Sequence, residues 1–125
     1  MRTLLLAALL AALPVVAAET QRISPAQLVD RIGKQDAGLV IVDVRTPEEF
    51  ANGHVPGAVN IPYTHMPARL AELASASDKD IVLYCESGVR TERAIARMKA
   101  NGFTRLLHLD GDMAKWREAK RTLEK

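Results

Sequence analysis

The sequence predicts an α/β domain with a mostly parallel central sheet of about five strands and helices on both faces. Short apolar runs alternate along the chain with segments that carry helix-start and helix-stop signals. One run, Leu39 to Asp43, is almost continuously apolar, as expected of a strand buried on both faces of a parallel sheet. In such folds ligands bind beyond the carboxyl ends of the strands, so the functional site is expected there.

The first half of the domain contains two helices with matching start signals. Ser24-Pro25-Ala26-Gln27 combines an N-cap, a Pro at the first helical position and a Gln three residues after the cap. This helix is expected to end at Gly33. Thr46-Pro47-Glu48-Glu49 repeats the pattern after the strand, so a second short helix is expected from Pro47 until Asn52-Gly53 stops it.

The second half continues the alternation. The expected elements are a strand at Ala58–Ile61, a helix at Pro67–Ala74, a strand at Ile81–Tyr84, a helix at Thr91–Ala100, a strand at Leu106–Leu109 and a terminal helix from Met113 to about Leu123. Asp112 is expected to cap the terminal helix, and Trp116 to pack it against the domain.

The first eighteen residues are typical of an export signal. Arg2 supplies a positive start, Leu4 to Leu13 an apolar core, Pro14 a break and Val16-Ala17-Ala18 a small-residue cleavage site. We expect residues 1–18 to be a signal peptide and residues 19–125 to be one mature domain, periplasmic or secreted and free of the membrane after cleavage. The alternative is an uncleaved anchor, but the apolar stretch is shorter than the ~20 residues that a membrane span needs.

Composition does not indicate a nucleic-acid partner, and none is expected. The formal net charge is +2, basic and acidic residues are interspersed, and the chain has only two Tyr, two Phe and one Trp. An apolar content of 48% with 26% charged residues is that of an ordinary globular domain.

The chain has a single cysteine, Cys85, which cannot form an internal disulfide. It is therefore either a buried, inert residue or a reactive thiol. Cys85 follows a predicted strand and opens the loop Cys85-Glu86-Ser87-Gly88-Val89-Arg90 before a predicted helix. Inward-pointing amides and a helix start stabilise a thiolate there, Gly88 can adopt a positive φ, and Arg90 offers donors to oxyanions. This context favours the reactive thiol.

Four segments of the chain resemble the successive signatures of the single-domain rhodaneses, or thiosulfate sulfurtransferases. They are Asp43-Val44-Arg45-Thr46-Pro47-Glu48-Glu49-Phe50, Gly53-His54-Val55-Pro56-Gly57-Ala58-Val59-Asn60-Ile61-Pro62, Cys85-Glu86-Ser87-Gly88-Val89-Arg90, and Leu109-Asp110-Gly111-Asp112 followed by Trp116. The resemblance covers nearly all of Ile23 to Ala119 and implies a rhodanese-like fold. One departure is Asp112, which stands where a second Gly is usual in the family.

The resemblance implies a sulfurtransferase with Cys85 as the nucleophile and no metal or cofactor. The thiolate would take sulfur from a small anionic donor, thiosulfate or a persulfide, and the Cys85 persulfide would pass it to cyanide or a thiol, including a thiol on a partner protein. The residues implied in substrate binding are Glu86, Ser87, Gly88, Val89 and Arg90, whose amides would cradle the sulfur, and Arg45.

Two other functions stay open. Cysteine-dependent phosphatases that resemble this fold place five residues between Cys and Arg, whereas here there are four, which suits a single sulfur better than a phosphate. Family members also occur as non-enzymatic sulfur-carrier or binding modules, usually without the loop cysteine. The presence of Cys85 favours the enzyme.

The charged residues near the loop have alternative interpretations. Glu86 either points into solvent or repels a dianionic donor, and Arg90, Arg45 or Arg93 is expected to offset its charge. Arg45 either borders the loop or forms a structural pair with Asp43.

Outside the loop, the three histidines, His54, His65 and His108, share no metal-ligand spacing. Arg93 and Arg97 follow one helical face, which is expected to be solvated, with Arg93 adding positive potential near the loop.

Overall fold

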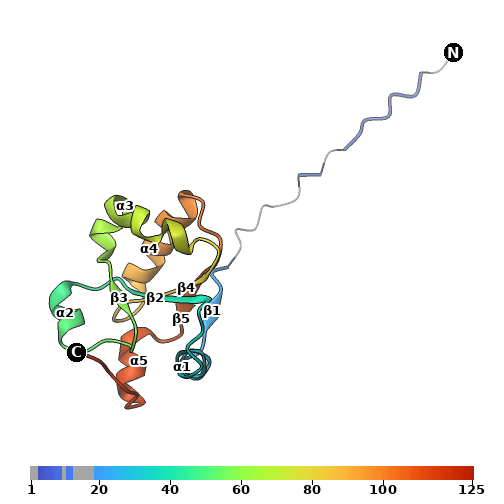
Figure 1. Cartoon of the computed structure of the whole chain (residues 1–125). Coiled ribbons are helices and arrows are strands. Elements are labelled where there is room, and N and C mark those ends of the chain that lie inside the picture. Colours follow the sequence, from blue (N-terminus) through green and yellow to red (C-terminus); the bar gives the residue numbers. More distant parts are fainter. Residues whose placement is uncertain (1–2, 10, 13–18) are drawn as a thin grey trace.

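The computed structural model describes residues 3–9, 11–12 and 19–125. The predicted cleavage site at residues 16–18 lies outside them, so the signal peptide stays a prediction. Residues 3–9 and 11–12 contain no helix or strand and lie away from the folded domain (Figure 1). In the part of the chain that the structure describes, no helix combines the length and the apolar character that crossing a bilayer demands.

Five parallel strands form a single sheet, which confirms the predicted fold class. The strands are β1 (Arg22–Ile23), β2 (Leu39–Asp43), β3 (Val59–Asn60), β4 (Asp80–Tyr84) and β5 (Leu106–Leu109). Their order is β1-β5-β4-β2-β3, and every neighbouring pair is parallel. The central strand β4 therefore has a strand on each side, and Cys85 lies directly beyond its carboxyl end.

Helices cover both faces of this sheet. The α-helices are α1 (Pro25–Gly33), α2 (Pro47–Ala51), α3 (Met66–Arg69), α4 (Val89–Ala100) and α5 (Asp112–Glu118), and the 3-10 helices are η1 (Tyr63–His65) and η2 (Leu70–Ala76). In Figure 1, α3 and α4 lie on one side of the strands, and α1 and α5 on the other.

Alternating side chains of β4 divide the core into two clusters. Ile81 and Leu83 pack into the cluster that contains Met98 of α4, and Cys85 continues their register. Val82 and Tyr84 face the opposite cluster, which contains the buried Trp116 of α5. This two-fold alternation places the Cys85 side chain on the α4 face of the sheet.

The two predicted helix starts are present as capping boxes. The hydroxyl of Ser24 accepts a hydrogen bond from the Gln27 N–H at 3.1 Å, and that of Thr46 accepts one from the Glu49 N–H at 3.2 Å. In each box the side chain of the third helical residue also accepts a hydrogen bond from the backbone of the cap. Each cap contributes roughly 1 kcal/mol to stability.

The helix predicted over 67–74 is present only in part, because α3 ends at Arg69 and the rest of the segment belongs to the 3-10 helix η2. Leu70, Leu73 and Ala76 recur every three residues, which matches the 3-10 repeat of three residues per turn. Leu73 and Ala76 are buried and Leu70 packs against the same cluster. The core-facing period of this segment therefore favours the tighter helix over a regular α-helix.

Other boundaries also differ from the predictions. α4 begins at Val89 rather than Thr91, and the strand predicted at Ala58–Ile61 keeps only Val59 and Asn60. β1, with only two residues, was too short to be predicted from an apolar pattern.

The terminal helix ends at Glu118 rather than near Leu123. Lys120 has a φ of 53°, so the chain turns back, and the Trp116 indole N–H donates to the Thr122 carbonyl at 2.9 Å. The backbones of His54 and Glu124 then exchange two hydrogen bonds of 2.9 Å each. The last residues thus lie against the loop that follows α2.

Candidate active site

Cys85 lies where the central strand ends, and its side chain is buried, with 1% of the residue exposed. The first turn of α5 holds the loop through two backbone hydrogen bonds. The Met113 N–H donates to the Cys85 carbonyl at 2.9 Å, and the Ala114 N–H donates to the Glu86 carbonyl at 3.1 Å. Strand β4 and helix α5 together therefore fix the backbone at the start of the loop.

One amide of the loop holds the sulfur directly. The Gly88 N–H donates to the Cys85 Sγ at 3.0 Å. Gly88 has a φ of 115°, and a Cβ there would lie 3.1 Å from the Asp112 Oδ2 and 3.3 Å from the His108 ring. Conformation and space both require glycine at this position. The amides of Val89 and Arg90 follow in the first turn of α4, where a helix has no internal acceptors for its N–H groups.

Arg90 does not face a free oxyanion position, because Glu49 of α2 holds it. The two Arg90 Nη atoms lie 2.6 and 3.0 Å from the two Glu49 carboxylate oxygens. The hydrogen bond with Arg90 lowers the pKa of Glu49 to about 2. The same carboxylate completes the Thr46 capping box, so α2 and α4 are joined beside the loop.

Arg45 forms a buried structural pair with Asp43, which was one of the two roles considered for it, and it also reaches the edge of the loop. Its Nη2 lies 2.7 Å from the Asp43 Oδ2 and donates to the Gly53 carbonyl at 2.8 Å. Its Nη1 lies 3.8 Å from the Glu86 carboxylate. Arg45 therefore fixes the end of β2 while adding positive charge near Glu86.

Glu86 forms an ion pair rather than simply pointing into solvent. The Arg117 Nη1 of α5 donates to the Glu86 Oε1 at 2.8 Å, and both side chains are about two-fifths exposed. Arg117, which the sequence analysis did not connect with the loop, thus neutralises Glu86, whereas Arg90 is paired elsewhere. Ser87 and Val89 are exposed on the outer side of the loop.

Asp112 forms the base of the loop instead of capping α5. Its residue is only 3% exposed and has a φ of 52°. Its Oδ1 accepts hydrogen bonds from the Cys85 N–H and the Thr91 hydroxyl, each at 3.0 Å. Its Oδ2 lies 2.9 Å from the His108 Nε2. One carboxylate therefore connects β4, α4 and β5 directly behind Cys85.

Two carboxylates hold the buried imidazole of His108. Its Nδ1 lies 2.7 Å from the Glu92 Oε1, opposite the contact with Asp112. Burial alone would lower the pKa of His108, but the hydrogen bonds and charges of Asp112 and Glu92 outweigh it, and the pKa is raised. Burial would likewise raise the pKa of Asp112, but His108 and the Cys85 N–H lower it. The two carboxylates thus favour the protonated form of the ring.

Loop residues line two surface hollows. One, of about 550 Å³, includes Ser87, Gly88 and Arg93, and the other, of about 330 Å³, includes Glu86 and Arg117. Among residues 3–9, 11–12 and 19–125, no group of three or more His, Cys, Asp or Glu side chains is arranged to hold a metal ion. The ring of His54 instead contacts the Phe50 carbonyl at 2.9 Å through Nδ1.

The fold and the site together define an α/β domain with a single cysteine at the carboxyl end of its central strand, in a loop whose Gly88 N–H donates to the cysteine sulfur. The chain belongs to the rhodanese-like domain family, whose family model matches residues 24–119. Nearly all of the folded part is thus covered.

Two curated relatives and one solved structure are similar to this chain. A protein of Allochromatium vinosum named sulfurtransferase is 38% identical over 78 residues, which are 62% of this chain and 71% of that protein. The uncharacterized protein YqhL of Bacillus subtilis is 41% identical over 76 residues, so the match spans 61% of this chain and 59% of YqhL. The rhodanese-like domain of the Anabaena Alr3790 protein has the same fold, with a TM-score of 0.74 at 23% identity over 85% of this chain and 80% of that domain.

Proposed function

We propose that this protein is a sulfurtransferase that works through a persulfide on Cys85. The Cys85 thiolate attacks the outer sulfur of the donor, and the bond between that sulfur and the rest of the donor breaks. The bonding electron pair leaves with sulfite when the donor is thiosulfate, or with a thiolate when it is a persulfide. Cyanide or an acceptor thiolate then attacks the outer sulfur of the persulfide and releases the Cys85 thiolate.

The observation that carries this proposal is the hydrogen bond from the Gly88 N–H to the Cys85 sulfur at 3.0 Å. A thiolate and a persulfide are both anionic, and both are stabilised by donors that are already in place before the reaction. Asp112 and the first turn of α5 hold the backbone of Cys85 from the other side. A donor to the sulfur and supports for the Cys85 backbone are therefore in place before the sulfur becomes charged.

The charge balance around the loop supports small anionic donors. Glu86 is paired with Arg117 and Glu49 with Arg90, so neither carboxylate stands unopposed near the sulfur. Thiosulfate and a persulfide both remain proposed donors. The relative named sulfurtransferase favours sulfur transfer over other cysteine chemistry. We also propose export to the periplasm or outside the cell, on the basis of the first eighteen residues.

The experiment is the intact mass of the reduced protein, without residues 1–18, after brief exposure to thiosulfate. We expect the wild type to gain one sulfur and the Cys85→Ser variant to gain none. Cyanide added afterwards should remove that sulfur as thiocyanate. A parallel sample receives a small-molecule persulfide. If neither donor adds sulfur to Cys85, or if the variant gains it equally, the proposal is wrong.

A further inference from the structure

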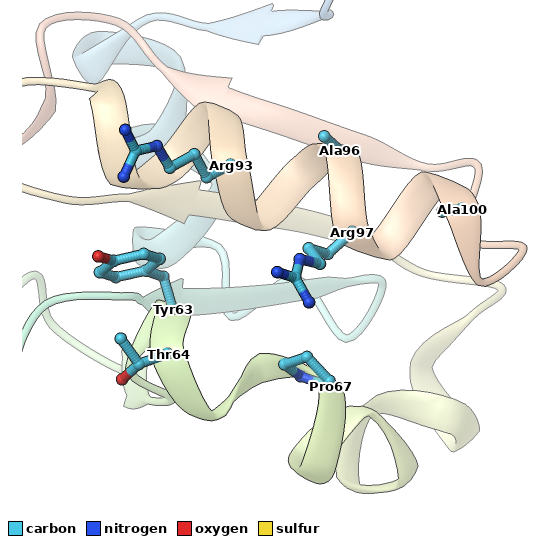
Figure 2. A pocket seen from close by; sticks show the side chains of 7 residues that line it. All are labelled: Tyr63, Thr64, Pro67, Arg93, Ala96, Arg97 and Ala100. Carbon is cyan, nitrogen blue, oxygen red and sulfur yellow. The ribbon is translucent and has the colours of Figure 1, made fainter.

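A cavity of about 770 Å³ lies between α4 and the segment formed by η1 and α3. Figure 2 shows Arg97 projecting from α4 toward Pro67 of α3 and Arg93 extending along α4 toward the N-terminal end of that helix. Tyr63 and Thr64 of η1 and Pro67 form the opposite wall. Small-molecule sites span roughly 300–1,000 Å³, so the size is suitable for a ligand. Both arginines are exposed, as the sequence analysis expected of a solvated face.

Arg93 and Arg97 differ from the other arginines in the part of the chain that the structure describes. Seven form salt bridges with carboxylates: Arg22, Arg31, Arg45, Arg69, Arg90, Arg105 and Arg117. Another, Arg121, lies over the Trp116 ring. Within residues 3–9, 11–12 and 19–125, Arg93 and Arg97 have neither kind of partner, and both line the same cavity. Two cationic forks are thus available to an anion.

The rest of the cavity complements a ligand that has two acidic groups. Arg93 and Arg97 are four positions apart on α4, so their backbones are separated by about 6 Å along the helix axis. The hydroxyls of Tyr63 and Thr64 hydrogen-bond to no other group among the described residues and can donate as well. Ala96 and Pro67 add an apolar surface suited to a short hydrocarbon spacer.

We propose that this cavity binds a small linear dicarboxylate, with one carboxylate on Arg93 and the other on Arg97. Guanidinium groups hold carboxylates through paired N–H donors, and two separate forks select two separate acidic groups. The cavity has the volume of a small-molecule site and lies between two segments of the chain. A small molecule therefore fits better than a protein surface.

The cavity adjoins the reactive loop. Arg93 also lines the hollow that contains Ser87 and Gly88, so a carboxylate held by Arg93 lies beside the loop that carries Cys85. Two kinds of molecule share this chemistry: a dicarboxylate that bears the thiol of a sulfur acceptor, and a dicarboxylate without a thiol that only occupies the cavity. This site goes beyond the proposed sulfur transfer, because its binding does not require the thiol of Cys85.

The test is calorimetric titration of the folded protein with glutarate, with butyrate as the monocarboxylate of similar length. Binding is measured on the wild type and on Cys85→Ser, so that it does not depend on sulfur transfer. We expect glutarate to bind more tightly than butyrate. Added salt should weaken the binding of glutarate. The Arg93→Gln/Arg97→Gln double variant should weaken glutarate binding about tenfold or more.

Two further variants keep this test specific. Lys99→Gln removes a positive charge from the same helix outside the cavity and should leave binding unchanged. Ala96→Glu places a carboxylate on the cavity wall and should abolish binding without unfolding α4, because Glu is a good helix former. Equal binding by the wild type and the double variant, or no glutarate binding at all, would overturn the proposal.

A final arm separates the two sources of the ligand. Glutarate that competes with a thiol acceptor in sulfur transfer identifies the cavity as part of the acceptor site. Glutarate that binds but does not compete identifies it as a separate ligand site.

Discussion

The carboxylate of Asp112 accepts a hydrogen bond from the backbone N–H of Cys85, at 3.0 Å, across 27 positions of sequence. The carboxylate that supports the loop thus contacts the backbone of Cys85 and not its sulfur. Because Asp112 also pairs with His108, its negative charge is balanced within the core. The Gly88 N–H that contacts the sulfur and the Asp112–His108 pair that supports the Cys85 backbone are therefore separate parts of one hydrogen-bond network.

Replacing Asp112 by Asn should destabilise the domain by about 1–3 kcal/mol, because the buried hydrogen bonds to a charged acceptor are weakened. The matched control is Asp110→Asn, since Asp110 forms an exposed pair with Arg22 at 3.5 Å. Exposed pairs contribute about 0–1 kcal/mol. Urea unfolding at neutral pH measures both. Equal losses for the two variants would contradict the role assigned to Asp112.

The stability contribution of His108 should depend on pH. Burial opposes the charge on the ring, but Asp112 and Glu92 raise its pKa above the ordinary value of 6.5. The contribution is therefore complete below pH 6.5 and is lost as the pH rises through the raised pKa of the folded state. The difference in unfolding free energy between wild type and His108→Gln should shrink over that range. The matched control is His65→Gln, which removes an exposed histidine. A loss from His108→Gln that stays constant over that pH range would contradict the prediction.

The stability contribution of Glu49 should have the opposite pH dependence to that of His108. Its pKa falls from 4.5 to about 2 because Arg90 hydrogen-bonds its carboxylate. The stabilisation is present above pH 4.5 and is lost as the pH falls toward 2. Glu49→Gln should cost about 1 kcal/mol at neutral pH, a modest value because the pair is partly exposed. Denaturation curves from pH 7 to the acid range, beside the neighbouring Glu48→Gln, measure the effect. A constant difference between Glu49→Gln and wild type would exclude it.

Gly88→Ala should abolish sulfur loading. The φ of 115° is strained for alanine, and the new Cβ would lie 3.1 Å from the Asp112 Oδ2. The loop must then shift away from the Cys85 sulfur, and stability should fall by about 1–3 kcal/mol. Gly33→Ala is the control, because nothing lies within 4 Å of its Cβ position. Intact mass after thiosulfate exposure gives the readout. Normal loading by Gly88→Ala would show that the Gly88 geometry is dispensable.

Arg117→Gln should lower the specificity constant for thiosulfate, because Glu86 then keeps an unbalanced negative charge beside the loop. Adding Glu86→Gln to Arg117→Gln should recover much of the lost specificity constant. Glu86→Gln alone should change the specificity constant less than Arg117→Gln does. Kinetics of all four proteins at low salt form a double-mutant cycle. Strictly additive effects would mean that the pair does not control donor approach.

Features that depend on neighbouring residues were predictable from the sequence. The boxes that begin α1 and α2 depend on three-residue spacings, and the position of Cys85 depends on an apolar run followed by a helix. The ion pairs of the site were not predictable, since Glu86–Arg117 and Glu49–Arg90 join residues 31 and 41 positions apart. Only the packed elements bring such partners together.

Asp112 shows why a local pattern can mislead. An Asp at the start of a helix is a good cap, and the sequence gave no indication that Asp112 accepts a hydrogen bond from the distant Cys85 instead. In the structure Gly111 takes the position before the helix with a φ of 77°, and Asp112 turns inward. Burial and the donors of three separate elements then determine its function. A local motif cannot reveal an environment assembled from distant parts of the chain.

The segment after α5 borders the loop of Cys85 without contacting the cysteine sulfur. Leu123 lines the hollow that contains Glu86 and Arg117, and its side chain packs against Gly53. The segment provides none of the groups that hold the sulfur. Substitutions there can therefore reshape this hollow without altering the groups that contact the Cys85 sulfur.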